Sequence, residues 1–167
     1  EAPPAEAKKP IILGYGAELS GVFASFGVVA ILGLTTYFDD LNRKGGILGH
    51  PVEWITLDNE SDPTKAVMNA KRLIIEEKVH MLLTDGCTGN SLAVVGSIAD
   101  LHMPTLGGSG LSVFHDQIKK MGGDEFYWTF QMLGGDWREW VGTTHKFILS
   151  FGTKSAVLYP ETALGKG

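Results

Sequence analysis

Three segments of this sequence combine glycine with serine or threonine, and such residues are suited to holding a small ligand. They are residues 17–26, 85–90 and 107–112. Glycine lets backbone N–H groups come close to a ligand, and the hydroxyl groups add hydrogen-bond donors and acceptors. Ordinary turns and helix caps require the same residue types. Taken singly, each segment therefore leaves a turn and a binding loop as alternatives.

The segment around Thr88 has a further property, because a predicted helix begins nearby. The free N–H groups and the positive dipole end of a helix favour an anion such as a carboxylate. The neighbouring Cys87 follows a predicted strand. A cysteine in that position either packs as a small apolar residue or acts as a nucleophile.

The elements that must position these segments alternate between strand and helix. Apolar runs and periodicities predict strands at residues 11–15, 52–57, 79–83, 104–106, 127–130 and 156–159, and helices at residues 27–44, 63–77, 91–101 and 137–151. Gly45 and Gly46 end the first helix, while Asp62 and Pro63 suit the start of the second. This alternation predicts an α/β fold, a Rossmann-like parallel sheet with helices on both faces. Ligands bind such sheets beyond the carboxyl ends of the strands, where all three segments fall.

Composition excludes several classes of function. The net charge of −5 comes without a dense basic cluster, so we expect no nucleic-acid partner. No run approaches the roughly 20 apolar residues that span a bilayer. Gly14 and Gly16 begin a dinucleotide-like pattern, but Leu19 stands where its third glycine should be. The histidines lack metal-ligand spacing, so neither a metal nor a cofactor is expected.

Residues 1–10 are rich in alanine and proline and predict a flexible leader. The leader would suit a mature N-terminus after signal-peptide removal, and a cytosolic tail is equally compatible with its composition.

Several motifs occur in an order that resembles the periplasmic branched-chain amino-acid binding proteins of ABC transporters. They are Leu19-Ser20-Gly21, Phe26-Gly27, the run Asn42-x-x-Gly45-Gly46-Ile47-x-Gly49, and Asp62-Pro63. The resemblance implies a type I periplasmic binding fold, a clamshell of two lobes that close on a ligand. Residues 11–135 would form the first lobe, and residues 136–167 would supply a crossover helix and the first strand of the second. The chain would then be an N-terminal fragment, and we expect it either to self-associate or to leave the segment beyond about Phe151 mobile.

The resemblance also implies roles for particular residues. A ligand carboxylate would meet Thr88 and the neighbouring N–H groups, including that of Cys87. A ligand ammonium group would meet the segment Gly108-Ser109-Gly110, and Phe26 would lie against the ligand. Ser61 stands where the family often has a cysteine partner for Cys87, so we expect a free thiol here.

These observations predict a periplasmic solute-binding protein without catalytic activity. It would bind an amino acid or a similar carboxylate and deliver it to a membrane permease. The same clamshell could instead be the sensing domain of a receptor or regulator. A third alternative is an α/β enzyme that uses Cys87 or a histidine.

Overall fold

Strands and helices alternate along the chain, as the sequence predicts. The structure, a computed structural model, describes residues 8–107, 116, 119–120, 128–131 and 150. Its elements are β1 (Ile11–Ala17), α1 (Ala24–Arg43), β2 (Val52–Asp58), α2 (Pro63–Ile75), β3 (Met81–Leu83), α3 (Thr88–Ile98), the 3₁₀ helix η1 (Ala99–Leu101), β4 (Thr105–Gly107) and β5 (Thr129–Gln131). The predicted helix at 137–151, apart from residue 150, and the predicted strand at 156–159 lie outside the described residues.

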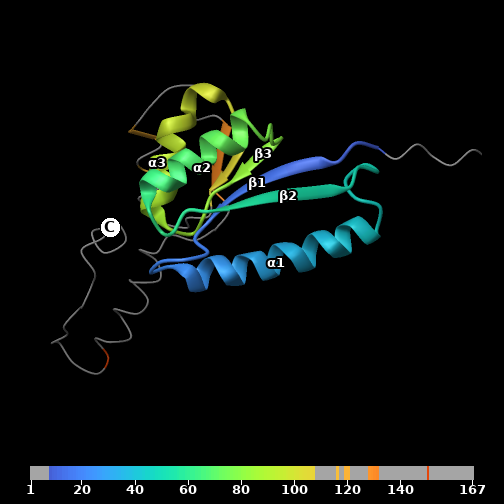
Figure 1. Cartoon of the computed structure of the whole chain (residues 1–167), viewed down its shortest axis with the longest axis horizontal. Coiled ribbons are helices and arrows are strands. Elements are labelled where there is room, and N and C mark those ends of the chain that lie inside the picture. Colours follow the sequence, from blue (N-terminus) through green and yellow to red (C-terminus); the bar gives the residue numbers. More distant parts are fainter. Residues whose placement is uncertain (1–7, 108–115, 117–118, 121–127, 132–149, 151–167) are drawn as a thin grey trace, which may run out of the picture.

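The strands form one parallel sheet in the order β2-β1-β3-β4-β5. From β1 the chain moves to β2 on one side, and from β2 it returns to β3 on the other side of β1. Helix α1 lies on one face of the sheet, and α2 and α3 lie on the opposite face (Figure 1). The predicted fold class is therefore confirmed. The strand order reverses between β1 and β3, and ligands of open parallel sheets bind at such a point.

Each face of the sheet has its own apolar packing. On the α1 side, Phe38 packs with Leu13 and Val52, and Tyr15, Ala17 and Leu83 form a neighbouring cluster. On the other side α2 and α3 cover β3 through a cluster made of Ala66, Ala70, Leu73, Val79, Leu82, Val94 and Ile98. Burial on both faces explains why the strands are short apolar runs without strict alternation.

The start of α2 follows from its sequence. The side chain of Asp62 caps the helix, because its Oδ1 accepts a hydrogen bond of 2.8 Å from the Lys65 N–H. Pro63 follows at the first helical position, where a missing N–H costs nothing. Ala66, Ala70 and Leu73 then lie on one buried stripe. Both predictions for this helix start are confirmed.

The end of α1 is fixed to β2 by a single asparagine. Gly45 and Gly46 adopt positive φ angles of 102° and 71° and end the helix, as predicted. The Asn42 side chain accepts from the Val52 N–H at 2.7 Å and donates to the Val52 carbonyl at 2.8 Å. It thus binds the edge strand as a neighbouring strand would. This pairing gives the asparagine of the Asn-x-x-Gly-Gly-Ile-x-Gly run a structural role.

Several boundaries differ from the sequence prediction: β1 ends at Ala17 rather than at residue 15, and α1 begins at Ala24 rather than at residue 27. Helix α3 begins at Thr88 rather than at residue 91, with Cys87 as its N-cap. Strand β3 starts at Met81 rather than at residue 79. The His80 N–H still donates to the Ile12 carbonyl at 2.7 Å, so the chain approaches the sheet before the regular ladder begins.

The prediction that no segment approaches membrane-spanning length was wrong. Among the described residues, α1 is long and apolar enough to cross a membrane by length and composition, a test that core helices and signal sequences also pass. The strands before and after α1, β1 and β2, nevertheless pair in parallel over their whole length. The pairs run from Ile11 with Val52 to Ala17 with Asp58. Since α1 joins these strands, it is their crossover helix and lies along the sheet.

Candidate functional site

The loops that follow β1 and β3 meet at the point where the strand order reverses. Glu18 comes directly after β1, and Gly86 lies in the loop between β3 and α3. The Gly86 N–H donates to Oε1 of Glu18 at 3.2 Å. Two loops far apart in the sequence therefore form one edge of the molecule, where the fold predicts a ligand.

The loop after β2 holds the first of these loops in place. Oδ1 of Asp58 accepts from the N–H groups of Leu19, Ser20 and Glu60 at 2.8–3.2 Å. Its Oδ2 accepts from the Ser20 hydroxyl at 2.7 Å. Although desolvation opposes the effect, these hydrogen bonds lower the pKa of Asp58. The carboxylate is therefore ionised at neutral pH and fixes the start of the loop.

The loop after β2 also contacts the loop between β3 and α3. Nδ2 of Asn59 donates to Oδ2 of Asp85 at 2.6 Å. The Ser61 hydroxyl donates to the Ser20 carbonyl at 2.8 Å and accepts from the Phe23 N–H at 3.1 Å. Ser61 therefore binds the loop after β1. Hydrogen bonds thus join the loops that follow β1, β2 and β3.

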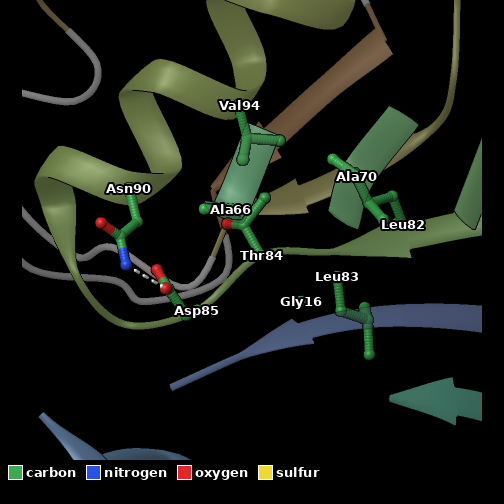
Figure 2. A pocket seen from close by; sticks show the side chains of 9 residues that line it. All are labelled: Gly16, Ala66, Ala70, Leu82, Leu83, Thr84, Asp85, Asn90 and Val94. Carbon is green, nitrogen blue, oxygen red and sulfur yellow. Dashed lines mark hydrogen bonds between the residues drawn. The ribbon is translucent and has the colours of Figure 1, made fainter. Parts of the chain in front are cut away.

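Asp85 is the centre of a buried polar cluster at the start of α3. The amide of Asn90 points at the Asp85 carboxylate, to which it donates at 2.7 Å, and Thr84 lies beside them in a small cavity (Figure 2). The Cys87 N–H donates to Oδ1 of Asp85 at 3.1 Å, and the Ser91 hydroxyl donates to the Asp85 carbonyl at 2.8 Å. Burial raises the pKa of Asp85, while the donors of Asn90, Asn59, Cys87 and Ser91 oppose the rise. The donors stabilise a negative charge on Asp85.

Glu18 is the second buried acid of this edge, and its surroundings are different. The residue is fully buried, and burial followed by the charge of Asp85 raises the pKa of Glu18 to about 7. The two carboxyls lie close enough to interact electrostatically. Adjacent buried carboxyls cannot both ionise cheaply. Asp85, whose carboxylate accepts hydrogen bonds from several donors, therefore carries the charge, and Glu18 holds the proton.

A largely apolar groove opens from this edge along the inner side of α1. Helix α1 contributes Phe26, Val29, Ala30, Leu34, Tyr37 and Phe38, and the sheet contributes Tyr15, Leu83 and Leu106. Glu18, Thr84 and Gly86 line its polar end. Apolar walls with a few polar groups at one end are typical of small-molecule sites.

The structure brings several predicted site residues to this edge. Phe26, in the first turn of α1, is 63% exposed and lines the groove. Cys87 is half-buried and caps α3, whereas Thr88 is nearly fully buried at 3% exposure. Gly108, Ser109 and Gly110 lie outside the described residues, directly after β4.

Sequence reasoning missed the acids and amides that organise the site. They are Glu18, Asp58, Asn59, Asp85 and Asn90. A signal was present, because an acid ends β2 and follows the end of β1 and of β3 within two residues. In a parallel sheet these positions share one edge.

Metal binding and thiol chemistry find no support at this edge. Within residues 8–107 and the shorter described stretches, no group of three His, Cys, Asp or Glu side chains could hold a metal ion. Burial raises the pKa of the Cys87 thiol, and the charge of Asp85 adds to the rise. A reactive cysteine needs the opposite shift, so Cys87 lacks the environment of a nucleophile.

Comparisons with known proteins bear on the family and the fold of this chain. Residues 10–167 match the family described as "Periplasmic binding protein". Over 82 residues the chain is 27% identical to an amino acid binding protein of Pseudomonas aeruginosa, a match that covers 49% of this chain and 22% of that protein.

Solved structures share the fold. One described as a branched-chain amino acid ABC transporter from Silicibacter pomeroyi matches with a TM-score of 0.72 and 28% identity, over 84% of this chain and 35% of that chain. The substrate-binding protein LivJ of Streptococcus pneumoniae, solved with isoleucine, matches with a TM-score of 0.64 and 23% identity, over 75% of this chain and 34% of that one.

The chain thus spans about a third of the length of these structures and less of the curated relative. The family binds solutes and is in general not enzymatic. Because the family match extends over nearly all of the sequence, this chain belongs to the periplasmic binding protein family.

Proposed function

We propose that this protein is an extracytoplasmic solute-binding protein of an ABC transporter. It binds a small amino-acid-like molecule or a related carboxylate between two lobes, of which residues 11–135 form the first, and delivers it to a membrane permease. The observation that supports this most directly is the hydrogen bond between Gly86 and Glu18, which unites the β1 and β3 loops beside an apolar groove. That arrangement provides a binding edge with polar and apolar parts.

The proposal gives the predicted residues distinct roles. Phe26 supplies an apolar wall, since its ring lines the groove and is largely exposed. Thr88 and the N–H groups at the start of α3 hold the ligand carboxylate. Gly108, Ser109 and Gly110 would then meet the ligand ammonium group. No residue has a catalytic role, and no cofactor takes part.

The role of Thr88 can be tested by Thr88→Ala. Losing a hydrogen bond to a charged ligand group should weaken binding by roughly 1.5–3 kcal/mol, about 10- to 150-fold in Kd. Isothermal titration calorimetry with leucine, on the longest form of the protein that the gene encodes, measures this change.

A matched control for this experiment lies in the neighbouring helix. Thr64 occupies the first turn of α2 and is exposed, whereas Thr88 begins α3 at the binding edge. Thr64→Ala should leave the affinity unchanged. Equal affinities of the Thr88→Ala and Thr64→Ala variants would remove Thr88 from the binding site.

A further inference from the structure

Within the described residues, two buried oxygen atoms at the binding edge accept no hydrogen bond, Oε2 of Glu18 and Oδ1 of Asn90. Oε2 of Glu18 is buried and has no hydrogen-bond partner within the part of the chain that the structure describes, whereas Oε1 accepts from the Gly86 N–H. Its neighbour is the Asp85 carboxylate, which is itself an acceptor. Two neighbouring acceptors repel each other, so a positive charge must lie between the Glu18 and Asp85 carboxyls. In the free protein that charge is a proton.

This position lies at the polar end of the groove, where the Glu18 side chain is fully buried. Glu18, Phe26 and Gly86 line the same groove, so the acid lies beside the apolar wall of the proposed site. Asp85 also occupies the Cys87 N–H at the start of α3. The charge of Asp85 thus lies beside the N–H groups proposed to hold a ligand carboxylate, and it disfavours a ligand that carries a carboxylate without a compensating cation.

We propose that Glu18 determines ligand specificity by binding a cationic hydrogen-bond donor of the ligand, such as an ammonium group, which replaces the proton shared with Asp85. The inference rests on the proposed solute-binding function and narrows its ligand class to zwitterions and cations. Each ligand cation that binds displaces one proton from Glu18 to the solvent. No covalent bond to carbon is made or broken.

Of Glu18 and the described groups that face it, Glu18 is the one whose charge changes near neutral pH. Asp85 and Cys87 face it from the β3–α3 loop, and Tyr15 faces it from β1. Burial raises the pKa values of Tyr15 and Cys87, so both stay neutral. Asp85 keeps its charge through its donors. A change in binding between pH 6 and pH 8 therefore reports on Glu18.

The experiment uses calorimetry with matched pairs of ligands. The pairs are glycine and acetate, leucine and 4-methylpentanoate, and phenylalanine and 3-phenylpropanoate. Each pair differs by the ammonium group. We expect an amino acid to bind at least about tenfold more tightly than its partner. Since the Glu18 pKa is about 7, Kd should be about tenfold weaker at pH 6 than at pH 8.

Proton release supplies a second readout. Titrations at pH 6 in buffers of different ionisation enthalpy should show close to one proton released per ligand bound. Glu18→Gln keeps the shape of the side chain but removes its charge, so it should abolish both the proton release and the preference for the amino acid. Glu53→Gln, at an exposed position on β2, removes the same charge away from the site and should change neither.

The outcomes separate the two proposals. If an amino acid binds but its partner binds equally well, or no proton is released at pH 6, the role of Glu18 is refuted and the solute-binding function stands. If none of the six compounds binds, the amino-acid-like ligand is refuted, and the role of Glu18 with it.

Discussion

Glu18 is an acid whose burial makes protein stability depend on pH. Its pKa of about 7 in the folded protein lies above the ordinary value of 4.5. Between these values the folded chain holds a proton that the unfolded chain has lost. The contribution of Glu18 to stability is therefore complete below about pH 4.5 and is lost as the pH rises through 7.

We accordingly expect Glu18→Gln to be more stable than the natural protein at pH 8, because a neutral side chain avoids the buried charge. The gain should be on the order of 1–3 kcal/mol at pH 8 and should be near zero at pH 5. Urea denaturation at both pH values measures the difference. Glu53→Gln serves as the control, and a similar pH dependence in both variants would contradict a buried charge at Glu18.

The sequence alone predicted the positions of these residues poorly. The apolar runs and the Gly, Asp and Pro signals are local, so the sheet, the cap at Asp62 and the helix end at Gly45 could be predicted from neighbouring residues. Asp85 and Glu18 become partners only because the topology places β3 beside β1. An acid after a strand looks like a solvated turn until its neighbour across the sheet is known.

At the scale of elements, the junction between α1 and β2 depends on Asn42. Its side chain makes both hydrogen bonds to the Val52 backbone, and Val52 is 1% exposed. Asn42→Ala leaves a buried N–H and a buried carbonyl without partners. We expect a loss of roughly 2–4 kcal/mol in the free energy of unfolding, since each lost bond costs about 1–2.

Thermal or urea denaturation measures the effect of Asn42→Ala. Arg43→Ala, at the adjacent exposed helix position, should change stability by less than about 0.5 kcal/mol. Equal effects of the two substitutions would show that the Val52 pairing does not hold the junction.

For the molecule as a whole, the two faces of the sheet should differ in local stability. Helices α2 and α3 share a buried cluster with β3, whereas Gly27 and Phe38 are the buried residues of α1. Several apolar side chains of α1 are largely exposed, including Val29 and Leu32 at 68% each. Few buried contacts mean a low free energy of local opening.

Hydrogen exchange on the 167-residue chain tests this difference. Amides of α1 should exchange faster than those of β1, α2 and α3, with Leu13 and Tyr15 among the slowest because β1 has a strand on each side. Identical protection on the two faces would show that the described part opens as a single cooperative unit.

The hydrogen bonds among the loops after β1, β2 and β3 bear on how quickly a ligand is captured. These bonds are present before any ligand arrives. Asp58 and Ser61 bind the loop after β1, and Asn59 binds the loop after β3. A ligand that meets this lobe encounters a surface that needs no ordering step. The rate of first contact should then be limited by diffusion and orientation. Discrimination among ligands would lie in how long each one stays.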